Sequence, residues 1–389
     1  MSISWGNWAV RVYATKSWVA LAQRFAVDHP MIIEHLEIAL KDPVPAVRLQ
    51  VAENLQVLYA AAPERMWKLA EQIATHEPDP RILAFCLSRS IRRFSYREPE
   101  RCEVVLSTVK ERLDNNIPVD EEARYLVLES LGGWTAQLYV CQGRGLTWTW
   151  LQEWATNPGC YRDLLDSFTS SLRKAMFDRY RVGSDAQSEA VSNRAQEGLA
   201  LILTHASRIL TEAHGVLKSD APETEKEEAT ERYIAAEKVI HHAMNQIYFG
   251  SGANASDPSD EAGLGSTTAM ARFLDDYADI LELLGTTREP ITLHYLIELY
   301  EFVIPGDPVR VFDAVYALLL GRGEEEGYQY ESLGQKKVVG MVERFIADHR
   351  GMFEDEARRA KLVAILRLFA DVGWPDSLRL LYDLPDLLR

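Results

Sequence analysis

The sequence predicts an all-α protein built as a solenoid of helical hairpins. Prolines recur in the first third of the chain at intervals of 20, 17, 19 and 19 residues, and amphipathic stretches of helix length lie between them. Proline is tolerated at the first position of a helix and excluded from helix interiors. One helix per ~19 residues, and one hairpin per ~38, is the repeat length of an α-solenoid. The periodic prolines are Pro43, Pro63, Pro80, Pro99 and Pro118.

The composition fits a folded protein that is not embedded in a membrane. Of the 389 residues 47% are hydrophobic, but no apolar run approaches the ~20 residues needed to cross a bilayer. The N-terminus has no basic region followed by an apolar core, so we expect no signal peptide and a cytoplasmic location. The four cysteines lack CxxC spacing and are expected to be reduced residues in helices or at helix ends: Cys86, Cys102, Cys141 and Cys160.

The net charge of −16 arises entirely from the second part of the chain. Residues 1–181 carry 22 acidic and 22 basic side chains, whereas residues 182–389 carry 36 acidic and 20 basic ones. Phosphate binding requires a basic surface, so we do not expect nucleic acid to bind the C-terminal half. The acidic excess fits either a solvated surface or a basic protein partner.

Residues 1–181 are expected to form the N-terminal part of the solenoid. Residues 1–30 are rich in aromatic side chains and form one or two helices that cap the solenoid or pack against something upstream. Residues 31–60 show the clearest helical hairpin. Its two helices place apolar residues at helical spacing: Ile32, Ile33, Leu36 and Leu40, then Val47, Val51, Leu55 and Leu58. Further hairpins follow near 63–94, 99–140 and 144–181, the last with a tryptophan-rich core.

Residues 31–60 resemble a HEAT repeat. The matching positions are Leu36, Leu40, Asp42, Pro43, Val47, Arg48, Ala52 and Leu55. The resemblance implies that Asp42 caps the second helix and that Arg48 reaches the aspartate of a neighbouring repeat, forming a structural ladder. The next repeat keeps Asp79 and Pro80, and the repeat after it keeps only the period and the apolar spacing. HEAT and armadillo-type solenoids hold partners, so the resemblance implies binding without catalysis.

A longer helical hairpin is expected at 182–249, where the short period ends. Helices at 184–217 and 223–249 would each be ~40–50 Å long. They are rich in alanine, which favours close approach, and they either project from the solenoid or brace it. Residues 250–267 are small, polar and glycine-rich and are expected to form a flexible linker. C-terminal helical repeats at 268–389 follow, with helices near 267–285, 290–303, 308–321, 335–349, 353–372 and 375–383.

A search for catalytic and metal-binding motifs finds little. The glycines at 263–265 lack the lysine of a phosphate-binding loop, and no GxSxG or HExxH sequence is present. Glu237 lies four residues before His241, which adjoins His242, and His294 lies four before Glu298. Such pairs can ligate a metal, but we expect them to be surface pairs. We therefore expect no catalytic residue, no cofactor and no metal.

Two charged segments are candidate partner-binding sites. The first is an arginine cluster that either gathers around an anion, on an acidic partner or a nucleic-acid backbone, or is neutralised by the nearby Glu98, Glu100 and Glu103. The second is an acidic, aromatic loop at 321–334 that either contacts a basic partner or is merely solvated. The arginines are Arg89, Arg92, Arg93, Arg97 and Arg101, and the loop residues are Glu324, Glu325, Glu326, Tyr328 and Tyr330.

The leading functional hypothesis is a non-enzymatic scaffold or recognition module that presents a concave surface to another protein. Both ends of the sequence suggest a module of a larger protein or complex. One alternative is a regulatory or sensor arm of a multidomain bacterial NTPase, such as a defence protein. Another is an anion or nucleic-acid binder that uses the arginine cluster. The sequence leaves the identity of the partner and the oligomeric state open.

Overall fold

The computed structural model describes residues 9–114, 121–255, 263–322, 335–371, 373 and 380–382. These residues form helices and the turns between them, and none of them lies in a β-strand, which confirms the all-α prediction. The chain divides into an N-terminal unit, Met1–Trp154 with Asp163–Ser171, and a C-terminal unit, Ala155–Arg162 with Leu172–Arg389. Within the described ranges no helix is long and apolar enough to span a membrane.

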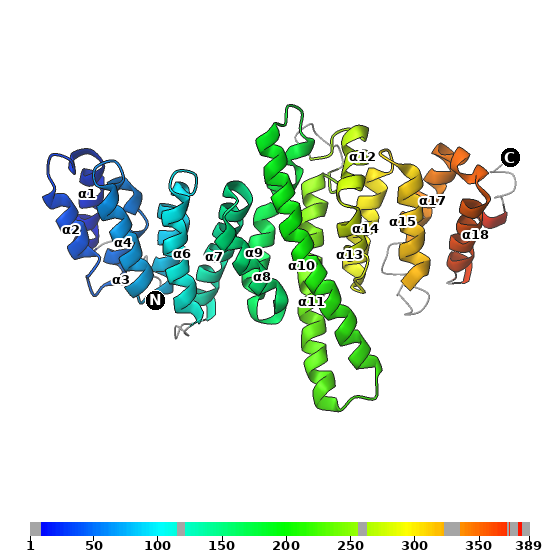
Figure 1. Cartoon of the computed structure of the whole chain (residues 1–389), viewed down its shortest axis with the longest axis horizontal. Helices are drawn as coiled ribbons and strands as arrows, with labels where there is room; N and C mark the ends of the chain where they lie inside the picture. The colour runs from blue at the N-terminus through cyan, green and yellow to red at the C-terminus, as the bar shows by residue number, and fades with distance from the viewer. Residues whose placement is uncertain are drawn as a thin grey trace. The chain divides into compact units, whose positions relative to one another are not determined.

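In the N-terminal unit, helices two positions apart along the chain pack against each other (Figure 1). The contacts join α1 to α3, α3 to α5, α5 to α7, and α4 to α6. A π-helical turn, Cys86–Ile91, and a 3₁₀ turn, Arg92–Phe94, continue α5. The helices are α1 (Val10–Phe25), α2 (Met31–Ala39), α3 (Pro45–Ala52), α4 (Pro63–His76), α5 (Pro80–Phe85), α6 (Pro99–Asp114), α7 (Glu121–Gln142) and α8 (Gly145–Thr156) as far as Trp154, followed by residues 163–171 of α9 (Pro158–Phe177).

The periodic prolines mark most of the helix starts that were expected of them. Pro63, Pro80 and Pro99 are each the first residue of a helix. The expectation for Pro43 is wrong, because α3 begins two residues later at Pro45. Val44 is held in an extended conformation by the proline that follows it, so the helix cannot start earlier. Pro118 lies outside the described residues.

Two glycines allow α7 and α9 to approach closely within the N-terminal unit. A Cβ atom at Gly132 would lie 2.4 Å from the backbone oxygen of Leu164. A Cβ atom at Gly133 would lie 3.1 Å from the hydroxyl oxygens of both Ser167 and Ser171. The first contact is with backbone and cannot relax by a rotamer change, whereas the second is with the ends of short side chains. The close packing of these helices therefore depends mainly on Gly132.

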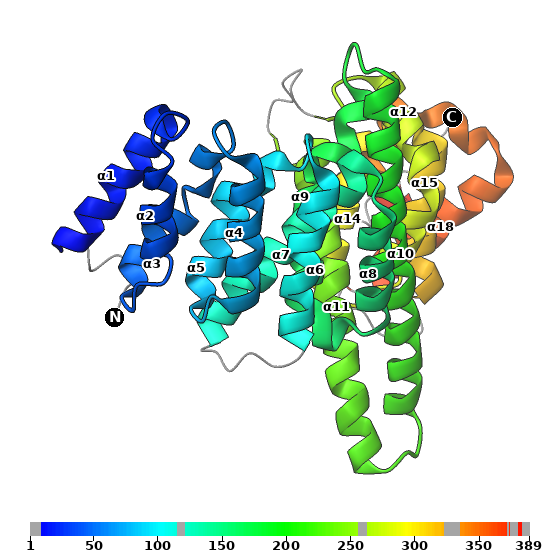
Figure 2. The same ribbon diagram turned by 60° about the vertical axis from the view of Figure 1, so that its left-hand side comes forward.

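The C-terminal unit is built around a long antiparallel hairpin of α10 (Ala186–Lys218) and α11 (Glu223–Ser251). The two helices pack along their length, and α10 also contacts α13 while α11 contacts α14. Figures 1 and 2 show the turn of the hairpin extending past α12, α13 and α14. The hairpin thus both braces these helices and projects beyond them. The remaining helices are α12 (Thr267–Asp276), α13 (Ala278–Leu284), α14 (Pro290–Val303), α15 (Pro308–Tyr316), α17 (Gln335–Asp348) and α18 (Glu356–Asp371).

Three expectations for the C-terminal unit need correction. The linker expected at 250–267 is partly wrong, since residues 250 and 251 belong to α11 and Leu264 is fully buried. The single helix expected at 267–285 is interrupted at Tyr277 and forms α12 and α13. The helix expected at 308–321 changes to a π-helical turn at Ala317–Arg322. The middle of the linker and most of the last expected helix lie outside the described residues.

Substitution of Gly132 tests the close approach of α7 and α9. We expect Gly132→Ala to lower the free energy of unfolding by about 2 kcal/mol, because overpacking a tight contact typically costs that much. Urea unfolding of the full chain, followed by circular dichroism, measures the change.

Gly133→Ala and Gly145→Ala are the matched controls. Gly133→Ala should lower the free energy of unfolding by less than Gly132→Ala does, because only serine side chains must move. The second should change stability by no more than about 0.5 kcal/mol, since nothing lies within 4 Å of the added atom. Equal effects of all three substitutions would contradict the packing.

Candidate functional site

Arg48 does not bind the aspartate that the HEAT resemblance implies as its partner. The guanidinium of Arg48 donates from Nε and Nη2 to the carboxylate of Glu77, at 3.0 and 2.8 Å, and from Nη1 to the backbone oxygen of Asp42 at 2.9 Å. Arg48 therefore reaches the next hairpin, but its partner is Glu77 and not Asp79. The hydrogen bond that Arg48 donates to Glu77 raises the pKa of Arg48. Both side chains are buried, so this pair is a structural connection between hairpins.

The two aspartates of the repeat differ in their roles. Asp79 is the N-cap of α5 and accepts the backbone N–H of Arg81 at 3.0 Å. Asp42 lies two residues before the N-cap of α3 and accepts the N–H of Val44 at 2.8 Å. Its carboxylate also pairs with Arg11 at 2.8 Å. Asp42 thus orders the turn before α3 without being its cap.

The five arginines of the predicted cluster do not converge on one position. Arg89 pairs with Glu53 at 3.2 Å, and Arg101 pairs with Glu64 at 2.6 Å and with Glu98 at 3.2 Å. Arg93 is exposed and donates to the backbone oxygen of Arg89, and Arg97 is also exposed. The partners of Arg89 and Arg92 thus lie on different elements, and Arg101 pairs with Glu98, one of the glutamates expected to neutralise the cluster.

Arg92 differs from its neighbours because its partners are uncharged. Its Nε donates to Gln137 Oε1 at 2.7 Å and its Nη2 to the backbone oxygen of Gly133 at 3.3 Å. Burial lowers the pKa of the Arg92 guanidinium. Both acceptors lie on α7, so Arg92 ties the end of the α5 segment to α7. The acidic loop residues Glu324, Glu325, Glu326, Tyr328 and Tyr330 lie outside the described residues.

The paired histidines and glutamates have structural partners, and the expectation that they are surface pairs is wrong for the buried Glu237. The buried carboxylate of Glu237 accepts the hydroxyl of Thr287 and the backbone N–H of Arg288, the latter at 2.9 Å. His241 Nδ1 lies 2.8 Å from Thr292 Oγ1. These contacts fix α11 to the loop before α14 and to the first turn of α14. Across the residues that the structure describes, no group of three ligands could hold a metal ion.

His294 and Glu298 form a pair on one face of α14. His294 Nε2 lies 3.6 Å from Glu298 Oε1, and Glu298 also pairs with Lys337 at 3.4 Å. The hydroxyl of Tyr248 donates to the second oxygen of the same carboxylate. Glu298 therefore connects α14 to α11 and to α17.

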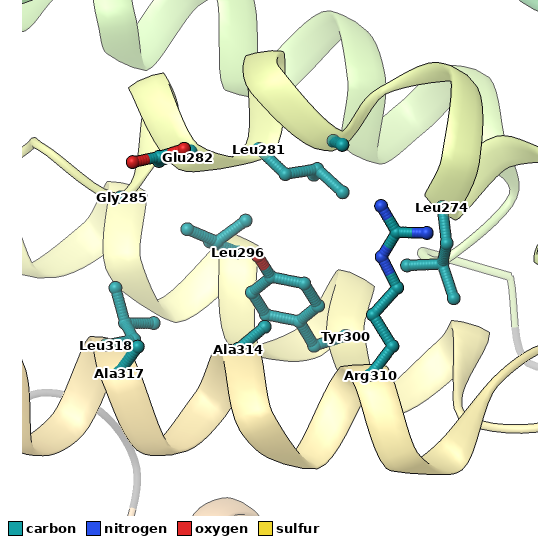
Figure 3. Close-up of a pocket in the computed structure, with 11 residues that line it drawn as sticks. Leu274, Leu281, Glu282, Gly285, Leu296, Tyr300, Arg310, Ala314, Ala317 and Leu318 are labelled. Carbon is teal, nitrogen blue, oxygen red and sulfur yellow. The ribbon is translucent and has the colours of Figure 1, made fainter.

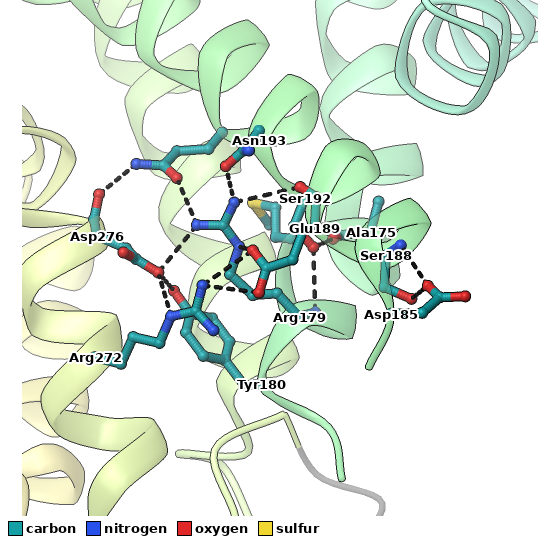
Figure 4. A network of polar contacts seen from close by, with 12 residues as sticks. Ala175, Arg179, Tyr180, Asp185, Ser188, Glu189, Ser192, Asn193, Arg272 and Asp276 are labelled. Carbon is teal, nitrogen blue, oxygen red and sulfur yellow. Dashed lines mark hydrogen bonds and ion pairs between the residues drawn. The ribbon is translucent and has the colours of Figure 1, made fainter. Parts of the chain in front are cut away.

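A buried polar network fixes the start of α10 (Figure 4). Arg179 donates from Nη1 to Asp276 Oδ2 at 3.0 Å, and the hydroxyl of Tyr180 donates to the same oxygen at 2.9 Å. Arg179 also contacts Asn193 and Gln196 on α10. Burial, together with the nearby charge of Asp276, raises the pKa of Tyr180. The partners named here belong to the chain itself, so we assign this network a structural role.

The outer part of the long hairpin is an exposed acidic surface. Between residues 211 and 228 only Ala213 is buried. Residues 211–232 carry seven acidic and three basic side chains. We call residues 211–232 the hairpin tip. Acidic residues at the start of α11, such as Glu223 and Glu225, also favour the helix because they lie at the positive end of its dipole.

A pocket of about 400 Å³ is lined by residues of α12, α13, α14 and α15 and of the π-helical turn that follows α15 (Figure 3). Its walls are mostly leucine and alanine. Figure 3 shows Arg310 at one end, Glu282 at the other, and the ring of Tyr300 between them. No sequence motif marks this pocket, because its residues come from several separate segments. Asp307 and Pro308 do indicate a helix start in the sequence, and this start fixes the position of Arg310 in the first turn of α15.

The chain matches no family model, and comparisons with the curated proteins and with the solved structures also gave no match. Its function has to be inferred from its own residues. The hairpin tip and the pocket are described features that the internal contacts above do not account for.

Replacing Arg48 tests the connection between the hairpins. Removing one partner of a buried ion pair leaves the other charge unpaired and costs about 3 kcal/mol or more. We therefore expect Arg48→Ala to lower the urea midpoint of the full chain clearly. Arg65→Ala is the control, since the Arg65–Glu37 pair is partly exposed and should contribute no more than about 1 kcal/mol. Equal losses of stability in the two variants would show that the buried Arg48–Glu77 pair contributes no more than the partly exposed Arg65–Glu37 pair.

The pH dependence of stability tests the environment of His241. Burial lowers its pKa, against the opposing charge of Glu289. His241 therefore binds a proton more weakly in the folded protein than in the unfolded chain, where a histidine is protonated below about pH 6.5. The contribution of His241 to stability is present above that pH and is lost as the pH falls.

Urea unfolding at about pH 7.5 and about pH 5.5 measures this loss. The loss should be smaller in His241→Gln than in the wild type, and unchanged in His76→Gln, which alters an exposed histidine. If His241→Gln loses as much stability between the two pH values as the wild type does, the loss does not come from His241.

Proposed function

We propose that this chain is a non-catalytic protein-recognition module and that the hairpin tip is its main contact surface. The observation that carries the proposal is the exposure of the tip over residues 211–228. Two isolated helices bury only the seam between them, and helical stability in proteins comes mostly from tertiary packing. A projecting hairpin of this length therefore gains little for the fold of its own unit. Contact with another molecule is the function that such an extension serves best.

The charge of the tip supports a basic protein surface as the partner. Its acidic side chains outnumber its basic ones by seven to three. Several of them, including Glu223, Glu225 and Glu227, are exposed and make no ion pair with any residue that the structure describes. A surface of one sign attracts a partner of the opposite sign and speeds association. The same charge disfavours nucleic acid as the ligand of the tip.

We also propose that the N-terminal unit is a short solenoid of HEAT-like hairpins. The packing of α3 on α5, α5 on α7 and α4 on α6 supports this proposal, since solenoid repeats contact their neighbours along the chain. The contact of Arg48 with Glu77, 29 residues further on, gives further support.

Shortening the hairpin tests the proposed function. Deleting residues 211–217 and 223–229 removes two helical turns from each helix and keeps the native connection at 218–222. The full-length chain and this variant, each tagged and expressed in the native host, are purified and their bound proteins are quantified by mass spectrometry. We expect a stoichiometric partner of the wild type to be lost from the shortened variant.

Charge reversal separates recognition from folding. The triple substitution Glu223→Lys, Glu225→Lys and Glu227→Lys should abolish the same association. The control reverses three exposed acidic residues of the same unit, Glu354, Glu356 and Asp371, and should leave the partner bound. The proposed function is wrong if both tip variants keep their folded circular-dichroism spectrum and also keep the partner at wild-type amounts.

A further inference from the structure

The pocket in the C-terminal unit is lined by a tyrosine hydroxyl that has no hydrogen-bond partner among the described residues. Tyr300 on α14 is only 6% exposed, yet its hydroxyl makes no hydrogen bond with any residue that the structure describes. Figure 3 shows this hydroxyl directed into the pocket, beside Leu296. A phenol hydroxyl can donate one hydrogen bond and accept others, and this one opens onto the pocket with that capacity unused by the described residues. Tyr300 therefore marks a position where a ligand atom would gain a hydrogen bond.

Arg310 supplies a cation at one end of the same pocket. It lies in the first turn of α15, where its backbone N–H is bound by Asp307. Its side chain pairs through Nη1 with Asp275, which is 76% exposed, so water screens this pair and it holds the guanidinium weakly. Nε and Nη2 donate to no residue within the described part of the chain. Arginine binds carboxylates through such pairs of donors.

The rest of the pocket is apolar, and its far end is acidic. Leu274, Leu281, Leu296 and Leu318 form the walls together with three alanines. Glu282 lies opposite Arg310 (Figure 3). The wall formed by Ala317 and Leu318 begins the π-helical turn, a rare geometry that is frequent at functional sites. At about 400 Å³ the volume lies within the range of small-molecule sites.

We infer that this pocket binds a small apolar monocarboxylic acid. The carboxylate pairs with Arg310 and accepts a hydrogen bond from Tyr300, and the apolar body packs against the leucines. Glu282 at the far end repels a second negative charge, so a dicarboxylic acid is excluded. This site is independent of the hairpin tip, and it would add a small-molecule ligand to a protein-binding chain.

Isothermal titration calorimetry of the full chain tests the site with probes of known chemistry. Decanoate and 4-phenylbutyrate represent an aliphatic and an aromatic monocarboxylate. Decylamine, decanol and decanedioate share the aliphatic body but change the charge or add a second one. We expect binding of at least one monocarboxylate at one site per chain, and at least about tenfold weaker binding of the amine, the alcohol and the dicarboxylate.

Variants assign the binding to the pocket. Arg310→Gln should weaken it about tenfold or more, and Tyr300→Phe should weaken it by severalfold. Ala314→Leu, which fills the pocket from α15, should abolish it while the circular-dichroism spectrum stays native. Arg208→Gln, an exposed arginine of the same unit, should leave it unchanged.

Three results would overturn the inference. One is the absence of binding by both monocarboxylates. Another is equal binding of decanol, which would show that the carboxylate is not recognised. The third is undiminished binding by Arg310→Gln and Ala314→Leu, which would place the ligand elsewhere.

Discussion

The ion pair between Arg179 and Asp276 is the interaction on which the C-terminal unit depends. The side chain of Arg179 is 4% exposed, so its charge must be balanced inside the protein. Asp276 supplies that balance from the end of α12, while Asn193 and Gln196 hold the same guanidinium from α10. One buried cation thus joins the base of the long hairpin to α12, the helix that carries Leu274 at the pocket.

A second set of buried polar contacts holds the other helix of the hairpin. Glu237 accepts from Thr287 and from the backbone of Arg288, and Tyr248 donates to Glu298. These contacts attach the C-terminal half of α11 to α14 and to the loop before it. The described contacts of the hairpin tip are of another kind, since Arg232 pairs with Glu212 on the exposed surface at 3.1 Å and the buried side chains are Ala213 and Ala229. The division between a fixed base and an exposed tip therefore follows from where the buried polar groups lie.

The sequence predicted the local structure well, because local signals determine it. Asp79 and Asp307 cap their helices and the prolines after them begin those helices. The long hairpin was predicted within two residues at each end, since helix length and alanine content are properties of the segment itself. The failure at Pro43 has a local cause too, because Pro45 holds Val44 extended and delays the start of α3.

The sites were predicted poorly, because they depend on which elements meet. Arg89 and Arg92 lie one turn apart, and sequence spacing suggests that they act together. In the structure their partners, Glu53 and Gln137, lie on different elements. The pocket is a second case in which the sequence does not reveal which residues meet. Tyr300 and Arg310 are unremarkable in the sequence, and only the packing of α12 and α13, α14 and α15 brings them together.

Hydrogen–deuterium exchange of the full chain, resolved by peptide mass spectrometry, measures the division of the hairpin most directly. Exchange reports local opening, and amides in well-packed segments exchange slowest. Peptides from the base, at 192–206 and 236–248, should be strongly protected, and peptides from the tip, at 214–228, should exchange much faster. Equally strong protection along both helices would contradict an exposed tip that is available to a partner.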